Sequence, residues 1–223
     1  RDLHSFPTRR SSDLEPVQYN TVDAIGQPTT ASGAMMIPTG SDGACQGPRP
    51  IVVYAHGTQV ERAFNIANIT AADSAEGLLI AVVFASQGYI VVAPNYAGFD
   101  TSTLPYHPFL NADQQSKDTA DSLTAARSAL PTSFAPSVTD SGKLFVTGYS
   151  QGGFVAMATH RLLQASGATV TASAPMSGPY ALGAFGDAVF FGDVVGGAPL
   201  FMTYAVTGRS EEHTSELQSQ NRI

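Results

Sequence analysis

The segment "LFVTGYSQGGFVAMATHRLL" constrains the fold more strongly than any other part of the chain. Its first residues have the apolar, β-branched character of a buried strand, and the residues after Ser150 have the spacing of a helix. Between them lies the pattern G-x-S-x-G, in which Gly148, Tyr149, Gln151 and Gly152 surround the serine. A tight turn between a strand and a helix exposes the serine hydroxyl and directs the backbone N–H of Gln151 at the same point. The segment therefore predicts that Ser150 is a nucleophile on an elbow and that Gln151 donates to an oxyanion.

Strand and helix patterns alternate along the rest of the chain, which is typical of an α/β protein. Repeated strand–helix–strand units predict a mostly parallel sheet with helices on both faces, and "VQYNTVDAIGQPTTASGAMMIP" predicts an N-terminal antiparallel hairpin. Residues 180–208 are apolar and glycine-rich, and we interpret them as the start of a helical lid or cap. The expected strands lie in residues 49–57, 89–98, 142–150 and 169–180, and the expected helices in residues 73–88, 111–131 and 151–167, the second capped near Asn111.

Both ends of the chain differ from its middle: they are polar, and their few apolar residues do not recur at the spacing of a helix or a strand. Residues 1–14, "RDLHSFPTRRSSDL", match residue by residue the translation of a common short-read sequencing adapter, and "RSEEHTSELQS" near the other end matches the opposite adapter. Such segments are set aside before a fold is argued. We therefore expect residues 1–14 and 209–223 to derive from adapters. Residues 15–208 are then expected to form a partial domain, truncated before its last strands.

Composition and charge narrow the classes of function. Hydrophobic residues make up 43% of the chain and charged residues 13%, which suits a globular protein with a substantial core. A formal net charge of −7 argues against nucleic-acid binding, and no apolar stretch approaches the roughly 18 residues of an integral membrane segment. The sequence has neither metal-ligand spacing nor a phosphate-binding loop, so we expect no metal and no other cofactor. The single cysteine, Cys45, is either a loop thiol or half of a bridge whose partner lies outside the chain.

A second motif, "VVYAHGT", lies at the end of an expected strand. A His-Gly-x turn at that place allows the backbone N–H of Thr58 to act as the second oxyanion donor. In this interpretation His56 and Gly57 brace the loop, and His56 as the catalytic base is the less favoured alternative. A third motif, "FASQGYIVVAPNYAGFD", ends a helix and leads through a strand into a Pro-Asn-Tyr loop on the same side of the sheet.

In this order the three motifs resemble the α/β-hydrolase superfamily. Within it they are most similar to the secreted serine esterases and lipases with an AHGT-type oxyanion loop and a GYSQGG elbow, including the secretory-lipase-like group. The resemblance implies the α/β-hydrolase fold, Ser150 as the nucleophile, and the amides of Thr58 and Gln151 as oxyanion donors. It also implies that the acid and then the histidine of the catalytic triad come later in the sequence, after Gly208.

The alternative is that the partners of Ser150 lie among the other polar residues of the chain, and each candidate is weak. His160 lies about 15 Å along the helix that begins after the serine, which is too far away to act as a base. His107 is expected to brace a loop or to form a pocket wall. Asp187 and Asp193 follow the serine, but no strand precedes them. The apolar residues Phe154, Met176 and Phe185 are candidates for an acyl pocket, with burial in the core as the alternative.

Together these features predict a serine hydrolase whose parent protein is an esterase or lipase acting on a small-molecule or lipid ester. The alternatives are a peptidase or acyltransferase of the same superfamily, or a non-catalytic binding protein that retains Ser150 by descent. The scarcity of lysine and the resemblance indicate a secreted or cell-envelope location, and nothing indicates an oligomeric state. We expect the 223-residue chain itself to be inactive and poorly soluble, because it would expose an apolar sheet edge.

Overall fold

The computed structural model describes residues 11–70, 75–133, 135–193 and 196–220, in which strands and helices alternate. The strands are β1 (Ser11–Val22), β2 (Pro28–Thr39), β3 (Pro48–Ala55), β4 (Ile90–Pro94), β5 (Thr139–Tyr149) and β6 (Ala172–Met176). The α-helices are α1 (Ala75–Val83), α2 (Ala112–Ala129), α3 (Gln151–Ala165), α4 (Leu182–Phe190) and α5 (Ala198–Gln220), and short 3-10 helices cover η1 (Gly43–Cys45) and η3 (Ala85–Gln87).

The strands form one six-stranded sheet in the order β1-β2-β4-β3-β5-β6. β1 and β2 form an antiparallel hairpin, and β2 is also antiparallel to β4. β4, β3, β5 and β6 run parallel to one another. The predicted α/β class, the mostly parallel sheet and the N-terminal hairpin are therefore confirmed.

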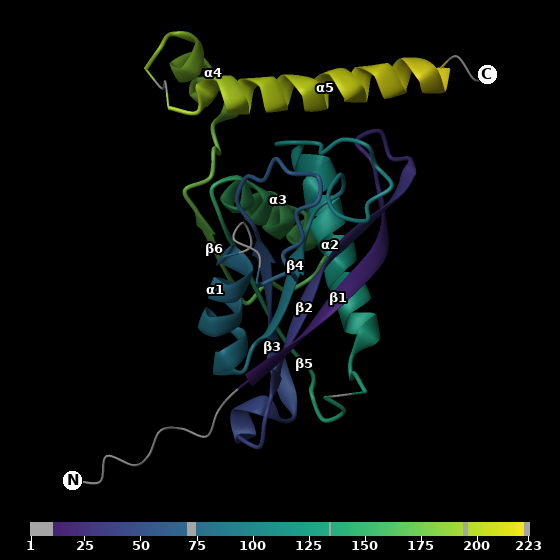
Figure 1. Cartoon of the computed structure of the whole chain (residues 1–223), viewed down its shortest axis with the longest axis vertical. Coiled ribbons are helices and arrows are strands. Elements are labelled where there is room, and N and C mark those ends of the chain that lie inside the picture. The colour runs from purple at the N-terminus through teal and green to yellow at the C-terminus, as the bar shows by residue number, and fades with distance from the viewer. Residues whose placement is uncertain (1–10, 71–74, 134, 194–195, 221–223) are drawn as a thin grey trace.

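The direction of each crossover places the helices on the two faces of the sheet. The connection from β3 through α1 to β4 moves toward the hairpin, whereas the connections through α2 and α3 move toward β6. Because such crossovers are right-handed, opposite directions of travel place α1 on one face and α2 with α3 on the other. Figure 1 shows α1 and α2 on opposite sides of the sheet.

The central strands are buried on both faces. Every residue of β4 is buried, as are the last five residues of β3, "IVVYA". A parallel strand between two helical layers has no solvent side, so its sequence is a continuous apolar run and not an alternation. Each such Val or Ile contributes about 1.5–3 kcal/mol by leaving water. This core fixes the carboxyl ends of adjacent strands, where the candidate site lies.

The segment after β6 forms helices, as expected for residues 180–208. In Figure 1, α4 and α5 lie across the end of the sheet at which β5 leads into α3. Tyr204 of α5 stacks on Phe109 with ring centroids 4.7 Å apart, so α5 rests on the loop after β4. The role of these helices as a lid remains a prediction. β1 begins and α5 ends inside the two adapter-like segments, whose origin also remains a prediction.

Candidate active site

Ser150 occupies the single residue between β5 and α3. Its backbone has φ 58° and ψ −122°, a conformation that a residue with a side chain rarely adopts and that costs about 1–3 kcal/mol. The turn is held by hydrogen bonds on both sides. Ser150 N–H donates to Met176 O at 3.0 Å, and Ser150 O accepts from the N–H groups of Gly153 and Phe154. The elbow therefore presents the hydroxyl at the N-terminus of α3 from a fixed, strained position.

The glycines of the elbow allow two backbones to touch. A Cβ atom at Gly152 would lie 1.9 Å from Ala55 O, and one at Gly148 would lie 2.5 Å from the same oxygen. Ala55 ends β3, the strand that leads into the loop of His56 and Thr58. Only glycine permits this approach, and the approach brings the two loops together.

The loop after β3 is braced through the backbone of Gly57. His56 is fully buried, with Nδ1 2.7 Å from Gly57 O and Nε2 3.1 Å from Asn95 O. Gly57 N–H donates to the Glu76 carboxylate at 3.2 and 3.3 Å. In a trans peptide the N–H points opposite to the preceding C=O, so holding Gly57 O fixes the direction of Thr58 N–H.

The lowered pKa and the backbone contacts of His56 are typical of a side chain that supports a loop. Burial lowers the pKa of His56, and the Glu76 carboxylate and the two backbone carbonyls oppose that effect. A backbone carbonyl oxygen lies beside each ring nitrogen, and the neutral ring donates to one of them; neither nitrogen contacts Ser150. Glu76 was not predicted from the sequence, because a single carboxylate in the first turn of a helix carries no distinctive pattern.

Gln151 is buried beside the serine, and its side chain contacts His107. Gln151 Nε2 lies 2.7 Å from His107 Nε2, and His107 Nδ1 lies 2.8 Å from Ala97 O. Burial lowers the pKa of His107 to about 3. His107 lies on the loop after β4, as expected from the sequence, but it lies beneath the site and does not line the cavity.

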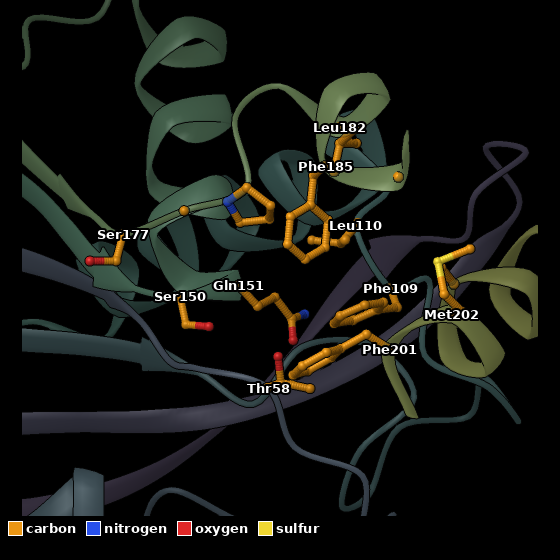
Figure 2. A pocket seen from close by; sticks show the side chains of 14 residues that line it. Thr58, Phe109, Leu110, Ser150, Gln151, Ser177, Leu182, Phe185, Phe201 and Met202 are labelled. Carbon is orange, nitrogen blue, oxygen red and sulfur yellow. The ribbon is translucent and has the colours of Figure 1, made fainter. Parts of the chain in front are cut away.

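A cavity of about 380 Å³ opens over Ser150. Figure 2 shows Ser150 and Thr58 facing the same space near the Gln151 side chain, with the rings of Phe109 and Phe201 close by. Phe185 lines the cavity as expected, whereas Phe154 and Met176 do not, and Phe154 belongs to the core. The lining residues are Thr58, Phe109, Leu110, Ser150, Gln151, Ser177, Gly178, Pro179, Leu182, Phe185, Gly186, Phe201, Met202 and Ala205.

None of the other polar candidates reaches Ser150. His160 Nδ1 contacts Ser173 Oγ at 2.8 Å, and Asp187 and Asp193 are exposed and outside the cavity lining. In the part of the chain that the structure describes, Ser150 Oγ makes no hydrogen bond, and no group of three or more His, Cys, Asp and Glu side chains is arranged to hold a metal. The structure thus brings together Ser150, Gln151 and Thr58, but no triad base or acid.

Comparison with known proteins finds one family model and several solved structures. The model of the prolyl oligopeptidase family matches residues 78–177. The structure of the rice cell wall degrading esterase LipA from Xanthomonas oryzae is 38% identical with a TM-score of 0.72, and the alignment covers 84% of this chain and 48% of that one. A putative hydrolase from Legionella pneumophila is 26% identical with a TM-score of 0.75 over 92% of this chain and 53% of that one.

Candida antarctica lipase A shares the fold at 16% identity and a TM-score of 0.61, with 96% of this chain and 51% of that one covered. No curated protein matches the chain. The chain thus spans about half the length of the solved structures that it resembles. Among the described residues, no helix is both long enough and apolar enough to cross a membrane.

Proposed function

The chain belongs to the α/β-hydrolase superfamily, and on this premise we propose that it is a serine hydrolase that cleaves carboxylic esters, with Ser150 as its nucleophile. One observation carries the proposal. The strained Ser150 at the junction of β5 and α3 lines a largely apolar cavity together with Thr58 and Gln151. This arrangement offers a nucleophile, two backbone donors and a surface for an acyl chain in one place. The likeness to an esterase supports the same chemistry.

The proposed reaction has two steps at the same centre. Ser150 Oγ adds to the carbonyl carbon of the ester and gives its proton to a base. The carbonyl oxygen becomes an oxyanion, which accepts hydrogen bonds from the N–H groups of Thr58 and Gln151. Collapse of this intermediate breaks the bond to the alcohol, which leaves with a proton, and the acyl group stays on Oγ. Water then adds to the acyl carbon, and a second collapse releases the acid and restores the serine.

The base and its orienting acid are proposed to come from the parent protein, in sequence that follows Gly208. In the α/β-hydrolase order these residues follow the nucleophile, acid first and histidine second. The three histidines whose side chains are described bond to other groups. The relatives are about twice as long as this chain, which leaves room for both residues.

The lining of the cavity favours an uncharged acyl group. Its polar side chains are those of Thr58, Ser150, Gln151 and Ser177, and no charged side chain is among the lining residues. We therefore propose a small-molecule or lipid ester as the substrate. Export from the cell is proposed on the resemblance to secreted esterases and on the low lysine content.

A peptidase is the second candidate, because the family model that matches residues 78–177 is that of prolyl oligopeptidases. A peptidase that recognises a charged peptide terminus needs a counter-charge in its site, and the described cavity offers none. Hydrolysis of matched p-nitrophenyl esters and p-nitroanilides of the same acyl group by the full-length product would separate the two activities.

The test of the proposed function is the reaction of Ser150 with a fluorophosphonate probe that carries an alkyl chain. We expect one adduct per chain, located at Ser150 by peptide mass spectrometry and absent from Ser150→Ala. An adduct at another serine, or no adduct at all, would contradict the proposed nucleophile. The non-catalytic alternative predicts the second of these results.

A further inference from the structure

Beneath the candidate site, a continuous series of hydrogen bonds joins a buried carboxylate to the residue after the nucleophile. Asp118 Oδ2 accepts the N–H of Ala97 at 2.6 Å, and Ala97 O accepts from Nδ1 of His107 at 2.8 Å. His107 Nε2 then lies 2.7 Å from Nε2 of Gln151. Asp118 is fully buried, and His107 and Gln151 are each less than 5% exposed. The bonds therefore lie in a low-dielectric interior where they are strong.

The chemistry of each atom fixes the direction of these bonds. A carbonyl oxygen only accepts, so the contact with Ala97 O requires a hydrogen on Nδ1 of His107. The neutral ring then has an unprotonated Nε2, whose single lone pair accepts from the amide of Gln151 at 2.7 Å, while the amide of Gln115 lies farther from the same atom, at 3.2 Å. Burial lowers the pKa of His107 to about 3, which keeps the ring neutral at physiological pH.

We propose that His107 is a positioning residue: its Nε2 holds the side chain of Gln151 and thereby fixes the backbone N–H of Gln151 against the oxyanion. This inference rests on the proposed function for its catalytic meaning, but the contact on which it depends is independent of any reaction. Gln151 is the first residue of α3. The backbone N–H groups in the first turn of a helix have no acceptor within the helix, so no intrahelical hydrogen bond fixes the N–H of Gln151. A side-chain anchor at this residue supplies that restraint.

Aromatic packing also holds His107 in place, so its nitrogens and its ring can be tested separately. The ring stacks on Tyr96 with centroids 5.6 Å apart and packs against Phe99 at 4.6 Å. His107→Phe keeps this packing and removes both nitrogens. His107→Gln loses the ring but keeps a donor for Ala97 O and an acceptor for Gln151, with similar spacing.

The test compares the rate at which a fluorophosphonate labels Ser150 in these two variants. Without a base, a serine hydrolase retains the part of its reactivity that comes from the oxyanion donors and binding, so the rate reports on those donors. We expect His107→Phe to slow labelling about tenfold, the effect of about one buried hydrogen bond, and His107→Gln to slow it less. The opposite order, with His107→Gln slower than His107→Phe, would show that only the packing matters and would overturn the proposal.

A double-mutant cycle isolates the contact. Gln151→Met removes the side-chain amide and keeps the backbone N–H. In that background we expect His107→Phe to change the labelling rate less than about twofold, because the anchor is already absent. An undiminished tenfold effect would place the action of His107 elsewhere and would overturn the proposal.

The ring nitrogens provide a measurement that needs no reactivity. In the ¹⁵N NMR spectrum of the 223-residue chain at neutral pH, we expect His107 to show a protonated Nδ1 and an unprotonated Nε2, and Gln151→Met to shift the Nε2 resonance. A protonated Nε2, alone or in the imidazolium form, would overturn the proposal. If wild-type Ser150 is not labelled at all, the proposed function fails, and this spectrum alone decides whether the anchor exists.

Discussion

Gly152 marks the point where the elbow touches the end of β3, so the smallest possible side chain there should be severely destabilising. The Cβ atom of Gly152→Ala would lie 1.9 Å from Ala55 O and 2.7 Å from His56 O. Both atoms are backbone, which cannot rotate away as a side chain can. We expect a loss of about 3 kcal/mol or more in the free energy of unfolding, measured by urea denaturation.

Gly183→Ala is the matched control for this substitution. Gly183 lies in α4, and no atom lies within 4 Å of the Cβ position. Alanine there should be neutral or should stabilise the helix by up to about 1 kcal/mol. Equal losses in the two variants would show that the elbow and the loop after β3 are not in the close contact described.

Asp118 should make stability fall as the pH rises through the weakly acidic range. Burial raises the pKa of its carboxyl from 3.8 to about 6, although the donors Tyr19 and Ala97 oppose the shift. The folded chain therefore retains this proton at pH values where the unfolded chain has lost it. The free energy of unfolding then decreases between about pH 4 and pH 6, by about 3 kcal/mol.

Asp118→Asn tests this sign, because its amide cannot ionise. Its Oδ1 can still accept from Ala97 N–H, and its Nδ2 can donate to the oxygen of Tyr19, which lies 2.6 Å from the carboxylate in the wild type. We expect the variant to gain about 3 kcal/mol relative to the wild type as the pH rises from 4 to 6.5. A difference that stays flat over that range in urea denaturation would contradict the raised pKa.

At the scale of elements, α1 has apolar side chains on the face that points away from the sheet. Leu79 and Val82 are each 58% exposed, while Ile80 on the inner face is 2% exposed. We expect Leu79→Glu combined with Val82→Lys to change the midpoint of thermal unfolding by no more than about 2 °C and to reduce self-association. Differential scanning calorimetry and light scattering measure the two effects.

Ile80→Ala supplies the comparison on the same helix. It removes buried methyl groups and should cost about 2–5 kcal/mol. If the double substitution on the outer face were as costly as Ile80→Ala, the outer face of α1 would have to be packed against other parts of the chain.

Local patterns predicted the elements well, because they depend on residues close in sequence. The continuous apolar runs of β3 and β4, the Asn111 cap of α2 and the elbow at Ser150 all lie where expected. The pairings that hold the loops of the site were not predicted, since they join residues far apart in the sequence. Glu76 holds Gly57 across 19 positions, and His107 contacts Gln151 across 44. Such pairs follow from the packing of the sheet and leave no periodic signal in the sequence.

At the scale of the molecule, the order of the strands assembles the site. β4, β3 and β5 are neighbours in the sheet and run parallel, so their carboxyl ends emerge side by side. The loop after β3 provides Thr58, the elbow after β5 provides Ser150, and the loop after β4 lies beneath both with His107. Hydrogen bonds join these loops to one another, and α4 and α5 lie across the same end of the sheet (Figure 1).

The same arrangement predicts what the 223-residue chain can and cannot do. Ser150 has its proposed oxyanion donors, but no base bonds to it among the described residues. A single slow acylation is therefore expected, whereas repeated turnover needs a base to activate water for the second step. With a p-nitrophenyl ester we expect at most one equivalent of p-nitrophenol per chain, and no continuing hydrolysis above the background of Ser150→Ala. The source gene, sequenced past Gly208, should continue through further strands to an Asp or Glu and then a His. Its full-length product should hydrolyse the same esters catalytically.

Turnover by the 223-residue chain that disappears in Ser150→Ala would show that the chain already contains its base. A gene that encodes "RSEEHTSELQS" and then stops would instead disprove the adapter origin of that segment and favour the non-catalytic alternative.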